Sequence, residues 1–262
     1  MRTKQEQNKV RRRLLYLWFP HFSIERYKRI EIDKRAKQDD FSGIIIIQDQ
    51  AGRRVVIASC PLAFQMGVAV GLSLEDALAA CPSLLVFEAD LIADQLAIET
   101  LARWCGRYTP LVSIDKANKG LGNAGIWLDI TGCAHLFGGE ADLLNDIIAR
   151  LTAINWTAFG AISDTPGSAW AVARFSGGVT QLITPGEQQA ALSELPLSAL
   201  RLPKNTVDDL SKVGLRKISQ LMLVPRAPLR ARFGKNIRLR LDQALGIEKE
   251  TVSPQTLHSP YL

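Results

Sequence analysis

Near the middle of the chain the sequence reads Trp127-Leu-Asp-Ile-Thr-Gly-Cys-Ala-His-Leu-Phe-Gly-Gly-Glu140. It overlaps the apolar run 126–130, which has the length and composition of a buried β-strand. Residues 142–154 then place apolar side chains at helical spacing and predict an amphipathic helix. Another strand is predicted at 111–114, and the segment 116–125, rich in glycine and asparagine, is typical of an exposed loop. This part of the chain therefore combines strands with helices.

The same mixture extends toward both ends of this region. An aspartate and a glycine between the runs 43–48 and 54–59 suit a hairpin turn. Ser73 and Asp76 have the spacing of a helix N-cap and its partner. Residues 11–195 are thus predicted to form an α/β or α+β unit. Its other strands are predicted at 14–19, 84–87, 158–163 and 181–184, and its other helices at 61–67, 93–108 and 168–175.

The pattern changes after residue 200, where short helical segments end at glycine or proline. We predict four of them, which make residues 196–250 a small all-helical module. The first ten residues read as a disordered basic arm. Residues 251–262 read as a tail, and we expect the chain to be truncated before a further domain. The four predicted helices are 207–213, 217–224, 229–233 and 237–245.

Composition excludes several classes of protein. Of the 262 residues, 47% are hydrophobic and 22% are charged, which is ordinary for a folded soluble domain. No apolar run approaches the roughly 20 residues of a membrane span, and no secretory signal can be drawn, so we expect a cytoplasmic protein. The four cysteines and three histidines are scattered. Their spacing favours buried free thiols over a zinc site or a disulfide framework.

Charge is distributed unevenly. Residues 41–200 hold 8 Lys and Arg against 15 Asp and Glu, whereas residues 201–240 hold 11 against 2. A basic helical block of this kind is either a solvated surface or the electrostatic footprint of a phosphate-binding element. The candidate phosphate contacts are Lys212, Arg216, Lys217, Arg226, Arg230, Arg232, Lys235, Arg238 and Arg240.

Three segments, residues 101–115, 127–140 and 162–174, resemble the ImuB branch of the Y-family (UmuC-like) DNA polymerases. The likeness runs over residues 11–248 and is carried chiefly by the second segment. It implies an α+β palm with small fingers over residues 11–195, followed by a helical thumb with degenerate helix-hairpin-helix turns. The little-finger domain of the family would follow Leu262.

The resemblance also locates the carboxylates that active relatives use to hold two divalent ions. The first falls at Trp18, the second at Asp115 and the third at Lys116, so only Asp115 is retained. A shift of one or two residues in the alignment is the alternative explanation. Because no Asp or Glu lies within residues 11–24, such a shift cannot restore the first carboxylate. Asp129 matches a position that the family uses for support.

The positions that hold the nucleotide triphosphate in active relatives are changed as well. A tyrosine and an arginine are replaced by Pro61 and Phe64, and a set of lysines is replaced by Asp164, Pro166 and Trp170. None of these can make the charge-assisted contacts that a phosphate requires. We interpret Trp18, Phe64 and Trp170 as apolar filling of a former active site. The predicted site therefore holds no metal, nucleotide or other cofactor.

The resemblance implies a non-catalytic, DNA-binding scaffold in error-prone translesion synthesis and DNA damage repair during SOS mutagenesis. Its partners would be damaged or primed DNA, the sliding clamp, an ImuA-like protein and an error-prone C-family polymerase. The thumb turn at 201–205 lacks the glycines of active relatives, so side chains would have to supply phosphate contacts. Two alternatives stay open. One is an active Y-family polymerase with an unusual metal site, and the other is a metabolic α/β enzyme with an incidental basic helical region.

Overall fold

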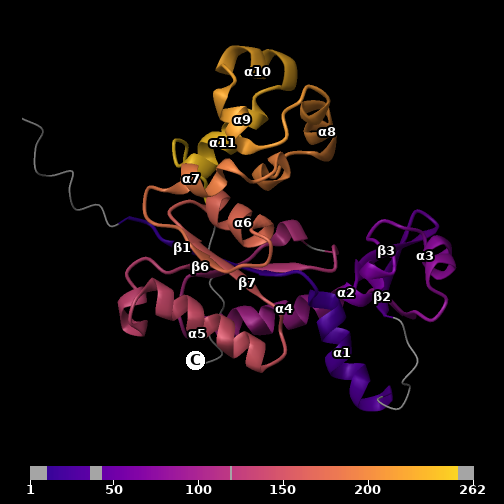
Figure 1. Cartoon of the computed structure of the whole chain (residues 1–262). Helices are drawn as coiled ribbons and strands as arrows, with labels where there is room; N and C mark the ends of the chain where they lie inside the picture. Colours follow the sequence, from indigo (N-terminus) through magenta and orange to yellow (C-terminus); the bar gives the residue numbers. More distant parts are fainter. Residues whose placement is uncertain (1–10, 36–42, 119, 253–262) are drawn as a thin grey trace, which may run out of the picture.

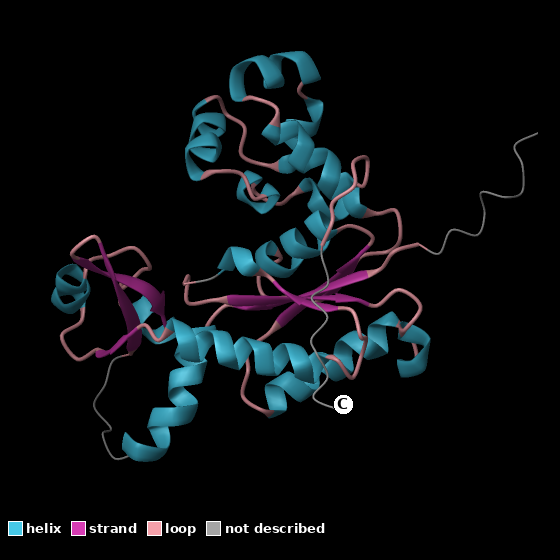
Figure 2. Cartoon of the chain, turned by 180° about the vertical axis from the view of Figure 1, so that it is seen from behind, coloured by secondary structure: helices cyan, strands magenta, loops and turns pink. Residues whose placement is uncertain are grey.

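The computed structural model describes residues 11–35, 43–118 and 120–252. It contains two β-sheets, helices on both faces of the larger sheet, and a group of short helices at one end (Figures 1 and 2). The predicted arm 1–10 and residues 253–262 of the predicted tail lie outside the described residues. No helix in the described ranges is long and apolar enough to cross a membrane.

The larger sheet has five strands in the order β5-β6-β1-β7-β8. Its central strand β1 pairs antiparallel with β6 and β7, and β8 runs parallel to β7. Because β1 has a neighbour on each side and helices over both faces, it is apolar along its whole length. The strands are β1 (Leu14–Phe19), β5 (Val112–Ile114), β6 (Ala124–Asp129), β7 (Phe159–Ser163) and β8 (Gln181–Leu182).

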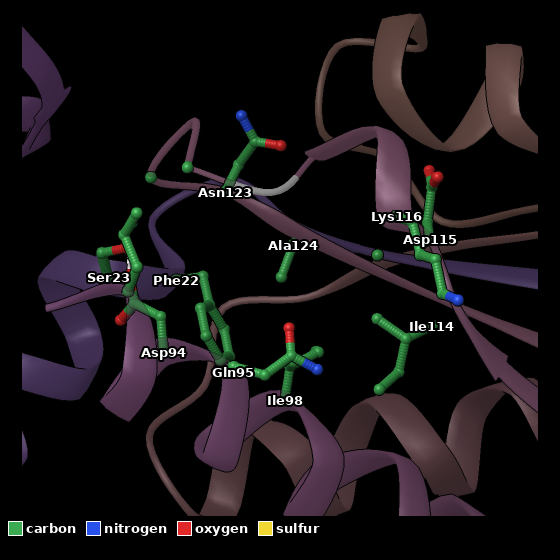
Figure 3. Close-up of a pocket in the computed structure, with 14 residues that line it drawn as sticks. Phe22, Ser23, Asp94, Gln95, Ile98, Ile114, Asp115, Lys116, Asn123 and Ala124 are labelled. Atoms are coloured by element: carbon green, nitrogen blue, oxygen red, sulfur yellow. Dashed lines mark hydrogen bonds between the residues drawn. The ribbon is translucent and has the colours of Figure 1, made fainter. Parts of the chain in front are cut away.

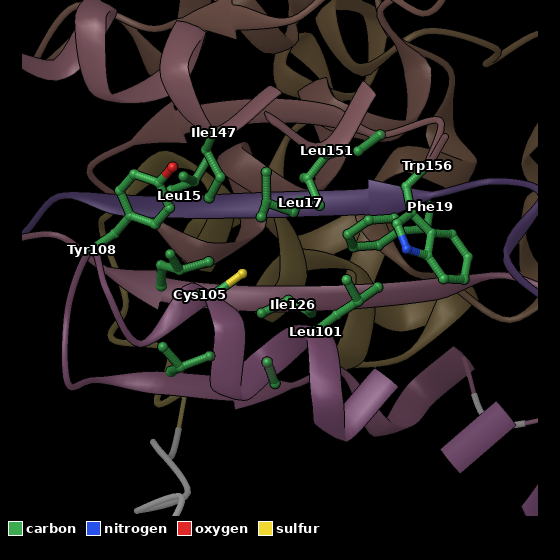
Figure 4. Packing of buried hydrophobic residues seen from close by; sticks show 14 of the residues in the cluster. Leu15, Leu17, Phe19, Leu101, Cys105, Tyr108, Ile126, Ile147, Leu151 and Trp156 are labelled. Carbon is green, nitrogen blue, oxygen red and sulfur yellow. The ribbon is translucent and has the colours of Figure 1, made fainter. Parts of the chain in front are cut away.

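Alternate side chains of β1 enter different cores, as the two-residue period of a strand requires. Leu15, Leu17 and Phe19 point toward α4 (Leu91–Cys105) and α5 (Glu140–Ala153), which cover one face of the sheet (Figure 4). On this face they pack against side chains of both helices and of β6, among them Leu101, Cys105, Ile126, Ile147 and Leu151.

The opposite face is covered by α6 (Pro166–Phe175), and Tyr16 and Trp18 point toward it. The same hydrophobic cluster continues from α6 into the terminal helices, so those helices pack on the sheet through α6. Besides a 3-10 turn at Leu197–Leu200, the terminal helices are α7 (Gln188–Ser193), α8 (Lys204–Lys212), α9 (Ile218–Leu223), α10 (Arg226–Phe233) and α11 (Asn236–Leu245).

The smaller sheet has the order β3-β2-β4 and its own core. The predicted hairpin is confirmed as an antiparallel pair, and β4 lies parallel on the other side of β2. This unit stands apart from the larger sheet in Figure 1, joined to it through α1 (Phe22–Arg35). Its elements are β2 (Ile44–Gln50), β3 (Arg53–Ser59), α2 (Pro61–Gln65), α3 (Leu74–Ala80) and β4 (Leu85–Glu88).

Most predicted elements are confirmed within a few residues, and helix α1 is the main omission. Its sequence is polar, with a weak apolar stripe, and follows Pro20 and His21, so no periodicity indicated it. Helix α4 begins earlier than predicted because Asp90 caps it, accepting a hydrogen bond of 2.9 Å from the amide of Ala93. All four cysteines are free, and burial raises the pKa of the Cys105 thiol to about 12.

Candidate functional site

Asp115 lies just after β5, where its amide donates to the carbonyl of Gly125 and continues the sheet. Its Oδ2 accepts hydrogen bonds from the Tyr16 hydroxyl, at 2.8 Å, and from Nε1 of Trp170, at 3.2 Å. Its Oδ1 accepts the amide of Ala117 at 3.1 Å. Both oxygens of the retained carboxylate are therefore engaged by the protein itself.

Tyr16 is completely buried in the middle of β1 and packs against the Trp127 ring, with ring centroids 4.4 Å apart. Burial, and then the charge of Asp115, raise the pKa of its hydroxyl far above the usual range, while Arg174 acts in the opposite direction. The hydroxyl therefore stays protonated and acts as a donor. Gly125 on the neighbouring strand leaves room for it, because a Cβ there would lie 2.1 Å from the Tyr16 oxygen.

Arg174 brings a positive charge to this cluster from the last turn of α6. Its guanidinium carbon lies 5.0 Å from the centroid of the Trp18 ring and 4.6 Å from that of the Trp170 ring. Arg201 approaches Trp170 as well, at 5.5 Å. Indole rings attract cations through their negative faces, so the two tryptophans hold the guanidinium beside the carboxylate.

The three positions that matched the family's metal carboxylates thus have different environments. Trp18 is half-buried, and its indole nitrogen has no hydrogen-bond acceptor among the described residues. Lys116 is exposed, and in Figure 3 its ammonium and the Asp115 carboxylate point in opposite directions. The positive charge of this cluster comes from Arg174, which acts on Tyr16, the donor to Asp115, and which sequence reasoning missed.

These residues do not fit a pair of divalent ions. Hard cations need several oxygen ligands, and the carboxylates that flank a two-metal centre must be free to bind them. Here Asp115 is committed to protein donors and an arginine lies close by. Within the described ranges, no group of three or more His, Cys, Asp or Glu side chains is placed to hold a metal.

A small cavity of about 310 Å³ lies between α4 and the segment around Asp115 (Figure 3). Its walls include Phe22, Ile98 and Lys116. Its other carboxylate, Asp94, is engaged, because Ser23 donates to it at 2.6 Å and Arg26 forms an ion pair with it. This cavity therefore offers no additional free carboxylate near Asp115.

The expected nucleotide pocket lies between the smaller sheet and the start of α1. Pro61 is the first residue of α2, and Phe64 lines a groove of about 840 Å³ together with Val55, Val70 and Leu121. Among the described residues, the side chains that line this groove include no Lys, Arg, Asp or Glu. The groove therefore lacks the cations that a triphosphate requires.

The interpretation of Phe64 as buried filling is wrong. Its side chain is 64% exposed, whereas Trp170 is only 8% exposed and Trp18 is half-buried. The physical reason is that α2 is a short helix on the smaller sheet, in which Ala63 supplies the buried contact. Phe64 therefore points away from that core into the groove.

Asp164, at a position where active relatives carry a lysine, is built into an ion-pair cluster. Arg13 lies 2.7 Å from Asp164 and 2.6 Å from Glu140, and only 7% of its side chain is exposed. Asp164 also accepts from the amide of Gly186 and from the side chain of Gln188. This carboxylate ties the start of β1 to the segment that leads into the terminal helices.

The neighbouring positions also have structural contacts. Pro166 opens α6 after the N-cap Thr165, whose hydroxyl accepts from the amide of Ser168 at 3.2 Å. Asp129 pairs with Arg12 and supports the turn after β6. In the structure their roles are local.

Eight of the nine basic candidates of the terminal helices fall into two groups. Four have carboxylate neighbours: Lys212 with Asp209, Lys217 with Glu194, and both Arg226 and Arg238 with Asp242. Arg238 is the most enclosed, with 21% of its side chain exposed. The other four are exposed, and no ion pair is found for them among the described residues: Arg216, Arg230, Arg232 and Lys235.

The turn at 201–205 differs from a glycine hairpin. Arg201 adopts a left-handed conformation, with φ of 55°, which a glycine would adopt without strain. Its guanidinium is fixed by Glu250 at 2.7 Å and by the Trp170 ring. Arg240 pairs with the same glutamate at 3.0 Å. Arg201 therefore joins the terminal helices to α6, and Glu250 joins Arg201 to α11 through Arg240.

This arrangement of two sheets and a terminal helical group is that of a Y-family DNA polymerase palm, fingers and thumb. The chain is similar to "Crystal Structure of DinB from Sulfolobus solfataricus", with a TM-score of 0.72, 15% identity and coverage of 92% of this chain and 69% of that one. The chain is also similar to "Insertion ternary complex of Dbh DNA polymerase", with a TM-score of 0.74, 16% identity and coverage of 92% of this chain and 69% of that one. At this level of identity the likeness concerns the fold alone.

The chain belongs to the impB/mucB/samB family, whose model matches residues 37–174. It is 44% identical over 196 residues to Protein ImuB of Caulobacter vibrioides, covering 75% of this chain and 41% of that protein. DNA polymerase IV of Serratia proteamaculans is 30% identical over 221 residues, covering 81% and 60%. The chain therefore spans less than two thirds of these curated relatives.

Proposed function

We propose that the chain is a non-catalytic, Y-family polymerase-like factor that binds primed DNA in the response to DNA damage. The observation that carries this proposal is the state of Asp115, the retained carboxylate. Its oxygens accept from Tyr16, Trp170 and Ala117, while Trp18 and Lys116 occupy the other two carboxylate positions. Without free carboxylates the centre has nothing to hold the ions that phosphoryl transfer requires.

DNA binding is assigned to the terminal helices. Arg216, Arg230, Arg232 and Lys235 are exposed, and the structure gives them no carboxylate partner within its described ranges. Unpaired cations are the ones that can release counterions from a phosphate backbone. Such contacts fix position on DNA without reading sequence.

The wider role is proposed from the relatives. The similarity to ImuB supports a role in translesion synthesis after DNA damage. We propose further that this synthesis is error-prone and belongs to SOS mutagenesis, and that the chain acts in it as a cytoplasmic scaffold. The sliding clamp, an ImuA-like protein and an error-prone C-family polymerase are the proposed partners. We propose palm and fingers over residues 11–195 and a thumb over 196–250. The last strand, β8, ends at Leu182, and α7, the first of the short terminal helices, lies before the proposed boundary.

The test measures fluorescence anisotropy of a labelled primed DNA hairpin over roughly 50 to 200 mM salt. A parallel primer-extension reaction contains magnesium and all four nucleotides. We expect binding that weakens steeply with salt, and no extension. Extension that is abolished by Asp115→Ala would instead establish an active polymerase with an unusual metal site. Absence of DNA binding at low salt would refute the proposal.

A further inference from the structure

The cluster around Asp115 contains a cation, Arg174. Replacement of the other two carboxylates by Trp18 and Lys116 does not by itself explain why an arginine lies there. Arg174 comes from α6, whereas Trp18 and Asp115 come from the sheet, so the fold brings the three together. The guanidinium lies 5.0 Å from the ring of Trp18, the residue at the first carboxylate position. It also acts on Tyr16, whose hydroxyl donates to Asp115.

The surroundings favour a fixed cation. The rings of Trp18 and Trp170 both lie within 5.0 Å of the guanidinium carbon, a distance at which aromatic faces attract cations. Trp170 additionally donates to Asp115 and thereby fixes its ring. Arg174 itself is half-buried. The guanidinium is therefore positioned by two indoles at the carboxylate that would otherwise be left with a negative charge in an apolar setting.

We propose that Arg174 replaces the divalent ions of the ancestral centre as the counter-charge of Asp115, and that it excludes such ions. Two effects act together. A fixed positive charge repels an incoming dication over a few ångströms, and any carboxylate restored at position 18 would pair with Arg174 in preference to a metal. This inference rests on the proposed non-catalytic function. It names Arg174 as the residue that would prevent metal binding even if the lost carboxylates were restored by substitution.

The proposal separates two sets of variants. Trp18→Asp/Lys116→Glu restores all three carboxylates but keeps Arg174, and we expect it to bind Mn²⁺ poorly. Adding Arg174→Gln removes the charge and should raise the affinity for Mn²⁺ by at least about tenfold, given the Coulomb energy at this range. The matched control adds Arg103→Gln instead, since Arg103 is an exposed arginine of α4. It should leave the affinity unchanged.

Binding of Mn²⁺ is followed by the electron paramagnetic resonance signal of the free ion, with circular dichroism to establish that each variant is folded. If the carboxylate-restored variant binds Mn²⁺ as tightly with Arg174 as without it, the proposal is overturned. The proposal is also overturned if Arg174→Gln does not raise the affinity for Mn²⁺. DNA binding by the unmodified chain is scored separately, so this result and the proposed function can fail independently.

A second measurement leaves Trp18 in place. Arg174→Gln, Asp115→Asn and the double variant are compared by thermal unfolding. If Arg174 is the counter-charge, Asp115→Asn should lower Tm less in the Arg174→Gln background than in the unmodified chain. Arg174→Lys, which keeps the charge, should restore part of the difference. Additive changes in Tm would contradict a direct electrostatic role.

Discussion

The sheet around Asp115 and the terminal helices of the thumb carry charge in opposite ways. Around the sheet the charged groups have partners within the protein: Asp115 accepts hydrogen bonds from Tyr16 and Trp170, and Arg13, at the start of β1, pairs with Asp164. On the thumb, Arg230, Arg232 and Lys235 are exposed, with no ion pair in the part of the chain that the structure describes. Removing one partner of an internal pair destabilises a fold, whereas unpaired surface charge is available to a ligand.

If the proposed function is right, the difference shows how a polymerase fold can lose metal binding and keep DNA binding. Metal binding needs uncommitted carboxylates at one point, so a few substitutions that commit them are enough to remove it. Backbone binding of DNA is spread over many cations and tolerates the loss of several. The following predictions test whether the two regions are as separate as their charges indicate, beginning with the largest effect.

Asp164→Lys, which restores the residue type of active relatives, should destabilise the protein by about 3–5 kcal/mol, because it leaves a buried Arg13 beside a like charge. The measurement is urea unfolding followed by tryptophan fluorescence. The matched control is Asp209→Lys, since Asp209 is 55% exposed and pairs with Lys212. An exposed pair contributes about 0–1 kcal/mol. Equal losses of unfolding free energy for the two variants would show that the Arg13 cluster contributes no more to stability than an exposed ion pair.

Gly125→Ala tests the packing at the centre. Its Cβ would lie 2.1 Å from the Tyr16 oxygen and 2.6 Å from the ring carbon that bears it, so Tyr16 must move away from Asp115. We expect a loss of about 1–3 kcal/mol of unfolding free energy, typical of overpacked cores. Gly132→Ala is the control, since nothing lies within 4 Å of a Cβ there, although its φ of 76° adds backbone strain.

A second substitution, Tyr16→Phe, distinguishes the steric clash at Gly125→Ala from the backbone strain at Gly132→Ala. Tyr16→Phe removes the oxygen and should recover part of the stability lost in Gly125→Ala, but none of that lost in Gly132→Ala. The readout is the shift in denaturation midpoint of each double variant relative to Tyr16→Phe alone. Absence of any recovery at Gly125 would mean that the ring, and not the hydroxyl, sets the spacing of these strands.

On the thumb, Arg230→Gln/Arg232→Gln/Lys235→Gln should weaken binding to primed DNA about 10- to 100-fold and reduce the salt slope by roughly 2.7, as expected for three lost phosphate contacts. The control removes the same charge from cations that already have carboxylate neighbours, Lys212→Gln/Lys217→Gln/Arg226→Gln. We expect its effect to be smaller. If both triples behave alike, net charge decides the affinity and individual pairing does not.

The sequence predicted the strands of both sheets well, because runs such as 14–19 are apolar and bounded by polar or turn residues. It also located Asp115, Trp18 and Trp170, since a family pattern fixes register. It could not identify Tyr16 and Arg174, whose role depends on a strand and a helix that are far apart in sequence and meet only in the fold. Nor could it predict that Lys116 points away from Asp115, because two adjacent residues project in different directions.

Substitution of Phe64 should change the free energy of unfolding least of all, and substitution of Trp170 provides the contrast. Both were interpreted from sequence as filling for a lost active site, yet their exposures are 64% and 8%. Phe64→Ser should therefore change the free energy of unfolding by less than about 0.5 kcal/mol, as is usual for surface substitutions.

Trp170→Ala should cost about 3–5 kcal/mol, because it empties a buried site and removes a donor from Asp115. Urea unfolding of the two variants side by side provides the measurement. A loss above about 2 kcal/mol for Phe64→Ser would mean that the groove of the fingers is covered in solution and that Phe64 does contribute to a core. A near-zero loss leaves the groove open, so only the sheet face below α6 has been filled by aromatic side chains.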